Sequence, residues 1–387
     1  MLNPFQSAYT KFYSTETTLL SLHHHLSNAI SLQQVSCLYL LDLSAAFDII
    51  DHSNPTPSSF HLVWHFLCFT TMVHFISLIP HIYCRNPSTQ FSLIPSYLQV
   101  SHGSVLGPVL FNLYITPLSS LISASSISHL LYANDTQFFK SFVPKNFSSA
   151  INNPQSTITL ISSWMSSNYL TLNPSKTEFL LIGLPQQTSK IVNPSLSLPT
   201  TIPIIPSLSA KNLDFIFDST LSLSKQISSL SSGFHYHIRD LRRIRHTLDS
   251  TTTTTIATAL VHSRIDYCNC LYHGLPITQI KRLRHIQNGF ARAVTRTPIH
   301  SHIAPVLKSL HWLKVEQRIQ YKIIFNTHNH LHITEPKYLH RLTNIKPSSR
   351  TRSSDHLCLS LPPVSTGSSL EIDHSAPPLP AYGTLYQ

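Results

Sequence analysis

Two apolar runs in the first half of the chain each lead directly to an acidic residue. The run CLYLL covers residues 37–41, and Asp42 closes it. Residues 130–132 (LLY) lead into the polar pair Asn134-Asp135, and residues 136–139 then resume a strand-like composition. An apolar run, a short polar turn and a second run predict a β-hairpin with an acid at its tip.

An acid at the end of a buried strand has a characteristic chemistry. Its carboxylate is poorly solvated and keeps its charge best beside a cation. Two such carboxylates brought together can hold Mg²⁺ through their oxygens, and Mg²⁺ supports phosphoryl transfer. Either acid considered alone is equally well explained as a strand-end or turn residue, so the functional interpretation depends on the segments around them.

Helical periodicity marks other parts of the chain. Ser14 or Thr15 followed by Glu16 predicts a helix that continues through residue 22, and a second helix is expected around residues 151–168. Beyond Phe234 the apolar period becomes helical, and a third helix of that region is expected from about residue 304 to 328. Basic side chains surround the apolar faces of the first two helices there, and those that we expect to contact a nucleic-acid backbone are Arg239, Arg242, Arg243, Arg245, Lys281, Arg282 and Arg284.

The net charge of +11 is concentrated in this helical region. Residues 1–210 carry 6 Lys and Arg against 6 Asp and Glu, residues 211–352 carry 21 against 7, and residues 353–387 carry 0 against 3. A strongly basic region beside a neutral one indicates a polyanionic partner. Charge alone also fits a solvated helical surface that has no partner.

Several other patterns carry less weight. His23, His24 and His25 are consecutive, and consecutive residues on a helix point in different directions, so we do not expect them to share a metal ion. Cys268 and Cys270 are separated by one residue, which is not the usual spacing of zinc ligands. The six cysteines are scattered and the first residues lack an apolar leader, which favours a reduced intracellular compartment, either the nucleus or the cytoplasm.

The segment from residue 60 to residue 80 is uncharged and has about the length of a membrane span. His61, His65 and His74 interrupt it, and it lacks basic flanks. We therefore expect no membrane partner and keep a membrane-anchored protein as an alternative.

Four ordered motifs resemble the reverse transcriptase of LINE-type (non-LTR) retrotransposons. In chain order they are YLLDLSAAFDIIDH (Tyr39 to His52) for motif A, GSVLGPVLFNLYITPL (Gly103 to Leu118) for motif B, HLLYANDTQFF (His129 to Phe139) for motif C and WMSSNYLTLNPSKTEFLLIG (Trp164 to Gly183) for motif D. The resemblance extends from about residue 6 to residue 385, with the exception of residues 53–98.

This resemblance implies an α+β fold. It consists of a right-hand polymerase palm, with an antiparallel sheet backed by helices and partial fingers, followed by a mainly helical thumb or connection domain. The implied boundaries are 1–185 for the partial fingers and palm, 186–233 for a linker or hairpin, 234–345 for the basic helical region and 346–387 for a mobile tail. We expect a degenerate and N-terminally truncated member of the family.

The resemblance also implies roles for single residues. Asp42 would be the metal ligand of motif A, and Lys176 would neutralise or protonate the departing pyrophosphate. Phe47 would exclude a ribose 2′ hydroxyl, and Gly103 and Ser104 would lie along the nucleotide. The implied cofactor is a pair of Mg²⁺ ions, and the implied partners are an RNA template, a DNA primer and deoxynucleoside triphosphates.

Motif C departs from the family pattern. The family has Tyr-Ala-Asp-Asp where this chain has Ala133, Asn134 and Asp135 after Tyr132, so an amide replaces the acid that bridges the metals. Lost electrostatic stabilisation of this kind lowers rates by at least ~10²-fold. We therefore expect an impaired RNA-directed DNA polymerase that uses two-metal nucleotidyl transfer. The alternative is a catalytically inactive retrotransposon remnant that at most binds nucleic acid.

Overall fold

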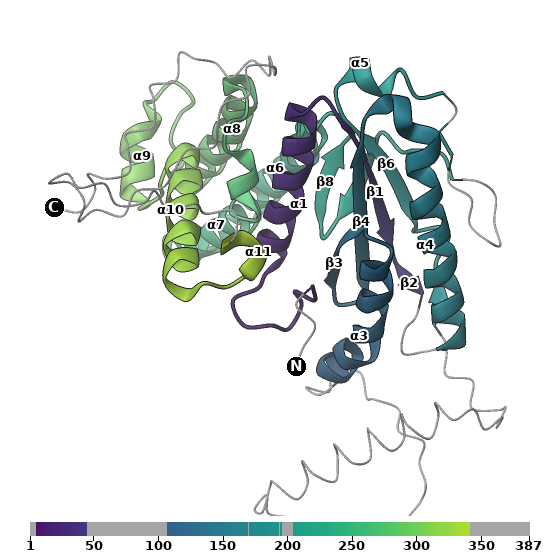
Figure 1. Ribbon diagram of the computed structural model, residues 1–387. Helices are drawn as coiled ribbons and strands as arrows, with labels where there is room; N and C mark the ends of the chain where they lie inside the picture. Colours follow the sequence, from purple (N-terminus) through teal and green to yellow (C-terminus); the bar gives the residue numbers. More distant parts are fainter. Residues whose placement is uncertain (1–4, 45–106, 169, 193, 196–203, 341–387) are drawn as a thin grey trace, which may run out of the picture. The chain divides into compact units, whose positions relative to one another are not determined.

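The computed structural model describes residues 5–44, 107–168, 170–192, 194–195 and 204–340. These residues have an α+β architecture, in which an antiparallel sheet and its helices precede a group of packed helices (Figure 1). The helical elements of the sheet part are α1 (Thr15–Ser31), α3 (Gly107–Ala124), η1 (Pro144–Asn146), α4 (Phe147–Ser167) and α5 (Pro185–Thr188).

The sheet is built around one fully buried strand. This strand, β1 (Val35–Leu41), pairs antiparallel with β4 (Asp135–Phe142) on one side and with β6 (Glu178–Ile182) on the other. The strand β3 (Ser128–Tyr132) pairs with β4 through a tight turn, which gives the order β3-β4-β1-β6. The hairpin with an acid at its tip, which the sequence pattern predicted, is therefore confirmed.

Different groups cover the two faces of the sheet, because alternate side chains of a strand point to opposite faces. Leu38 and Leu40 belong to the same apolar cluster as Leu19 of α1. On the opposite face, Tyr39 stacks between Phe138 and Phe179, with ring centroids 4.6 and 5.0 Å away. Figure 1 shows α1 and α4 on opposite sides of the sheet. The pairing and the two apolar layers position the C-terminal end of β1 beside the first residues of β4.

The helix α1 begins where the sequence predicted. Ser14 is the N-cap, its hydroxyl accepts a hydrogen bond from the backbone N–H of Thr17, and the Thr17 hydroxyl accepts one from the backbone N–H of Ser14. Such a reciprocal cap contributes on the order of 1 kcal/mol. The helix predicted around residues 151–168 is also confirmed, since α4 spans Phe147–Ser167.

The remaining described chain is a hairpin followed by helices. The hairpin strands β7 and β8 are tied to the main sheet, because the backbone N–H of Ser207 donates to the carbonyl of Phe179 and that of Gly183 to the carbonyl of Ser219. The elements are β7 (Ser209–Asn212), β8 (Phe215–Asp218), α6 (Ser224–Ile244), α7 (Ser250–Ile265), η2 (Asn269–Tyr272), α8 (Ile277–Thr295), α9 (Ile303–Ser309), α10 (Val315–Ile333) and α11 (Lys337–His340).

Two expectations about these helices need correction. The helix expected from about residue 304 to 328 is wrong, because α9 ends at Ser309 and α10 begins at Val315. Trp312 lies in this break and is buried, and its indole N–H donates to the hydroxyl of Thr258 at 3.2 Å. The first helix of the region also begins at Ser224, earlier than the change of period at Phe234 indicated. Ile227 and Leu230 continue the apolar spacing of Phe234 toward the N-terminus, but the serines between them obscure this pattern.

Candidate active site

Asp42 lies where the chain leaves β1, which pairs with β6, and enters a short strand that pairs with another segment. It follows β1 directly and precedes β2 (Leu43–Ser44), which pairs with β5 (Thr171–Leu172) instead of with β6. The backbone carbonyl of Asp42 accepts a hydrogen bond from the N–H of Asn173 at 3.0 Å. The Asp42 side chain is 19% exposed, so the end of β1 presents a mostly buried carboxylate that solvent and small ions can still reach.

The turn between β3 and β4 brings motif C to the same end of the sheet. Ala133 has a φ of 52°, in the left-handed region, which reverses the chain within two residues. Gln6, which is 1% exposed, holds this turn from the N-terminal segment. Its Oε1 accepts from the backbone N–H groups of Ala133 and Ala8, both at 3.1 Å, and its Nε2 donates to the carbonyl of Ala133 at 3.4 Å.

Three side chains surround the carboxylate of Asp42. The amide Nδ2 of Asn134 donates to Oδ1 at 3.1 Å, and the ammonium of Lys176 lies 2.9 Å from Oδ2. The last pair of β1 and β4 is Leu41 with Thr136, so the next residue on each strand is an acid, and Asp42 and Asp135 come at the same register position beyond that pair. The structure thus brings together Asp42, Asn134, Asp135 and Lys176, four of the residues that the sequence singled out.

The electrostatics of these groups follow from their proximity. Burial and then the negative charge of Asp42 raise the pKa of Asp135 to about 6, against a smaller opposing effect of Lys176. The hydrogen bond to Asp42, and then its charge, raise the pKa of the Lys176 ammonium. Among the residues that the structure describes, two carboxylates therefore share the positive charge of one exposed lysine, which leaves an excess of negative charge on these side chains.

The donor set suits one Mg²⁺ ion. Mg²⁺ is commonly held by one or two carboxylates, with water and substrate phosphates completing its coordination. Asp42 and Asp135 supply two carboxylates whose mutual repulsion a cation would relieve. Asn134 directs its NH₂ group toward Asp42, so in this arrangement it is a donor and not a ligand. Within the part of the chain that the structure describes, no group of three His, Cys, Asp or Glu side chains could hold a metal ion.

Lys176 reaches Asp42 from a turn that its own segment stabilises. The side-chain oxygen of Asn173 accepts from the backbone N–H of Ser175 at 3.1 Å, and the carbonyl of Asn173 accepts from the N–H of Lys176 at 3.2 Å. The same Asn173 donates its N–H to Asp42, so one residue positions both ends of the ion pair. The sequence interpretation did not single out Asn173, although it lies inside the quoted motif D.

Gln6 is the other site residue that the sequence interpretation missed. It lies where the resemblance to the family begins, but its contact with Ala133 joins positions far apart in the chain. The predicted nucleotide-binding residues Phe47, Gly103 and Ser104 lie outside the described residues, as does the apolar segment 60–80.

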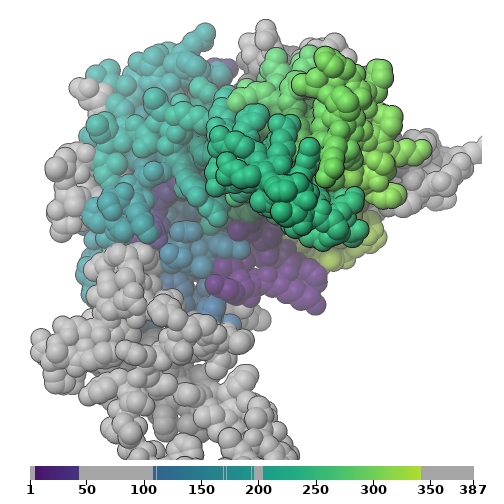
Figure 2. Space-filling model, turned by 180° about the vertical axis from the view of Figure 1, so that it is seen from behind, coloured from purple at the N-terminus to yellow at the C-terminus, as the bar shows by residue number. Residues whose placement is uncertain are grey.

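The seven basic residues of the helical part fall into two groups. Arg239, Arg242, Arg243 and Lys281 are exposed. The other three are half-buried and have protein partners: Arg284 pairs with Glu316, Arg282 donates to Gln279 and Ser228, and Arg245 donates to the carbonyl of Ala293. The space-filling view from behind shows the helical part, in green, on this face of the molecule (Figure 2).

Comparison with known proteins adds one finding about the family. A family model described as "Reverse transcriptase (RNA-dependent DNA polymerase)" matches residues 1–216 of the 387 residues. No curated protein matches the chain. The matched region ends within β8, so it includes the sheet and all four side chains at its end, whereas α6 and the following helices lie beyond it. The antiparallel sheet with helices on both sides agrees with the palm-type fold of such polymerases.

In the described residues no helix is both long and apolar enough to span a bilayer.

Proposed function

Because the chain belongs to the reverse transcriptase family, we propose that it is an RNA-directed DNA polymerase of LINE type whose catalytic centre is impaired at Asn134. Its substrates would be an RNA template, a DNA primer and deoxynucleoside triphosphates. The observation that carries the proposal is the meeting of Asp42, Asp135 and Lys176 at the ends of two paired strands. Nucleotidyl transfer needs carboxylates and a cation at one place, and the described chain brings them together here.

In this proposal each side chain has one role. Asp42 and Asp135 would hold a divalent ion, and the ion would neutralise charge on the triphosphate. Lys176 is 65% exposed and already forms an ion pair, so it can move from Asp42 to a negatively charged leaving group. Intact family members are expected to use two ions, and an amide at position 134 supplies less negative charge than the second ion requires.

Primer extension on an RNA template tests this function. With Mg²⁺ or Mn²⁺ we expect little product from the natural chain and at least ~10²-fold more from the Asn134→Asp variant, because that change restores the missing charge. The matched control is Asn134→Asp combined with Asp42→Asn, which should extend nothing. If the Asn134→Asp variant is folded and yet extends no primer, the polymerase proposal is wrong.

The second candidate function is a non-catalytic protein that binds nucleic acid. It is favoured by one specific observation, namely that protein donors already occupy both oxygens of the Asp42 carboxylate. The exposed Arg239, Arg242 and Arg243 would supply the contacts with phosphates. This function would be supported if the protein binds RNA or DNA with an affinity that falls steeply with salt, and if neither the natural chain nor the Asn134→Asp variant extends a primer.

A further inference from the structure

The N-terminal segment (residues 5–14) pairs with β3, the outer strand of the described sheet. The N–H of Leu131 donates to the carbonyl of Phe5, and the N–H of Ser7 donates to the carbonyl of Leu131, both at 2.9 Å. Gln6 therefore lies opposite Leu131 in a parallel bridge. This pairing brings Gln6 to the turn that carries motif C, although 127 positions separate it from Ala133 in the sequence.

The side-chain amide of Gln6 continues this pairing by one backbone position. Its Oε1 accepts from the N–H of Ala133 at 3.1 Å, and its Nε2 donates to the carbonyl of Ala133 at 3.4 Å. One amide thus binds both hydrogen-bonding groups of one residue, as the backbone of a neighbouring strand does. Gln6 is 1% exposed, so water competes little for these bonds.

Ala133 has a conformation that needs such support. Its φ of 52° lies in the left-handed region, which the Cβ atom of a non-glycine residue disfavours. Asn134 follows Ala133 directly, and the turn closes at the pair of Tyr132 with Asp135. A relaxation of this strained backbone would therefore move both Asn134 and Asp135 with respect to Asp42.

Neighbouring contacts hold Gln6 itself in place. The N–H of Ala8 donates to the same Oε1 of Gln6 at 3.1 Å. The carbonyl of Ala8 in turn accepts from Nδ2 of Asn112 at 2.9 Å, and Asn112 is a buried residue of α3. Because α3 lies outside the β3–β4 turn, the position of Gln6 does not depend on the turn alone.

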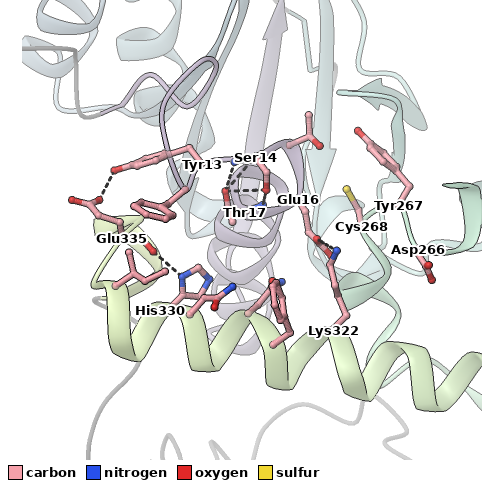
Figure 3. A pocket seen from close by; sticks show the side chains of 16 residues that line it. Tyr13, Ser14, Glu16, Thr17, Asp266, Tyr267, Cys268, Lys322, His330 and Glu335 are labelled. Atoms are coloured by element: carbon pink, nitrogen blue, oxygen red, sulfur yellow. Dashed lines mark hydrogen bonds and ion pairs between the residues drawn. The ribbon is translucent and has the colours of Figure 1, made fainter. Parts of the chain in front are cut away.

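The other end of the N-terminal segment is anchored to the helical part. The hydroxyl of Tyr13 donates to Oε2 of Glu335 at 2.9 Å, and just beyond the segment Oε2 of Glu16 lies 2.9 Å from the ammonium of Lys322 (Figure 3). Both contacts border a cavity of about 380 Å³, which His330 also lines. The segment that carries Gln6 is therefore fixed on both sides of the turn it supports.

We propose that Gln6 is a positioning residue of the catalytic centre, whose amide fixes the Ala133 backbone so that Asn134 and Asp135 meet Asp42. The inference rests on the proposed polymerase function, because it assigns Gln6 to the geometry of that site. The side-chain hydrogen bonds of Gln6 go to backbone groups, so it acts through the turn and not on the reacting atoms.

Solvent exchange of the Asn134 side-chain NH₂ group tests this geometry without any activity. The group donates to Asp42 at 3.1 Å. In protein labelled with ¹⁵N-asparagine, its NMR signal is the one that disappears in Asn134→Asp. Gln6→Met has a similar length but removes both hydrogen bonds to Ala133, so the NH₂ group should exchange at least ~10-fold faster once the turn no longer holds it against the carboxylate.

Gln287→Met is the matched control. Gln287 is also 1% exposed, and its Nε2 donates to the backbone carbonyl of Leu313 at 2.7 Å within the helical part. This variant also loses a buried hydrogen bond, but the exchange of the Asn134 group should stay as in the natural chain. Equal exchange in Gln6→Met and the natural chain would overturn the proposal, and so would an equal acceleration by both variants.

Primer extension in the Asn134→Asp background shows whether this geometry affects the reaction. Gln6→Met should lower kcat by about 10²-fold, as a misplacement of reacting groups by about 1 Å does, and should change KM for the primer–template by less than roughly 2-fold. Gln287→Met should change neither. An unchanged kcat in Gln6→Met would contradict the role of Gln6. If Asn134→Asp alone extends no primer, the polymerase function fails, while the exchange measurement still decides whether Gln6 positions the turn.

Gln6→Glu covers the case in which Gln6→Met does not fold. It keeps an acceptor for the N–H groups of Ala133 and Ala8 but loses the donor to the Ala133 carbonyl. The Asn134 NH₂ group should then exchange roughly 2–10-fold faster than in the natural chain, which corresponds to the loss of one neutral hydrogen bond. An unchanged exchange rate in this variant would refute the positioning role.

Discussion

Replacing Asn134 by aspartate should change how folding stability responds to Mg²⁺, independently of any activity. In the structure the Asn134 amide donates to Asp42 at 3.1 Å. A hydrogen bond to a charged acceptor is worth about 1.5–3 kcal/mol, and the variant replaces it with repulsion between two carboxylates. The side chain of Asp42 is 19% exposed, so water screens part of that repulsion. We expect a net loss of about 2 kcal/mol without divalent ions.

The same variant should gain more from Mg²⁺ than the natural chain does. It offers carboxylates at positions 42, 134 and 135 in place of two carboxylates and an amide donor. A ligand present at 100 times its dissociation constant stabilises the folded state by about 2.7 kcal/mol, which would offset the loss. The natural chain, with two carboxylates, should respond weakly over the same range of Mg²⁺ concentration.

Thermal unfolding in EDTA and in a Mg²⁺ titration measures both effects. In EDTA the variant should melt roughly 4–8 °C below the natural chain, since 1 kcal/mol corresponds to about 2–4 °C for a region of this size. Asn134→Leu is the control, because it removes the donor without adding charge and should lose stability that Mg²⁺ does not return. Equal Mg²⁺ responses of the Asp variant and the natural chain would refute the two-strand metal site.

Three further changes test other parts of the structure. Among the described residues the buried hydroxyl of Tyr39 has only the weakly polar thiol of Cys37 beside it, so Tyr39→Phe should raise the free energy of unfolding in urea by about 1 kcal/mol. Burial lowers the pKa of His23 to about 4, so its neutral ring contributes stability that is complete above pH ~6.5 and is lost as the pH falls toward 4. His23→Gln should therefore remove about 2 kcal/mol of the acid destabilisation between pH 7 and pH 5, and an unchanged pH profile would contradict this. Replacing Arg242 and Arg243 by Gln should lower the slope of log binding constant against log salt by about 2 for duplex nucleic acid, whereas Arg284→Gln, which breaks an internal ion pair, should leave the slope unchanged.

The parts of the site that local sequence determines could be predicted. The apolar run before Asp42 predicts a strand that ends there, and the polar pair after Tyr132 predicts the turn between β3 and β4, as found. Each prediction needs only a few neighbouring residues, because strand composition and turn chemistry are local properties. The order of the motifs then indicated that Lys176 lies near Asp42 and Asp135, and in the structure Lys176 forms an ion pair with Asp42.

What could not be predicted depends on contacts between distant segments. Gln6 holds the turn at Ala133, and no pattern of neighbouring residues reveals that contact. Trp312 is buried in the break between α9 and α10, and the helical periodicity on both sides of it gave no sign of that break. The cavity at Glu335 and His330 was not expected either, since it forms only when residues at opposite ends of the described chain meet.

The pairing of β1 also has a consequence for synthesis of the protein on the ribosome. Val35 lies opposite Phe142 and Ser36 lies opposite Ile182, so both neighbours of this strand are translated long after it. Its seven buried residues must wait in an incomplete sheet until residue 182 has left the ribosome. Such distant pairing slows folding and leaves an apolar strand open to aggregation in the meantime. In a nascent chain, the apolar residues of β1 therefore stay without both partner strands for most of the time needed to translate the sheet.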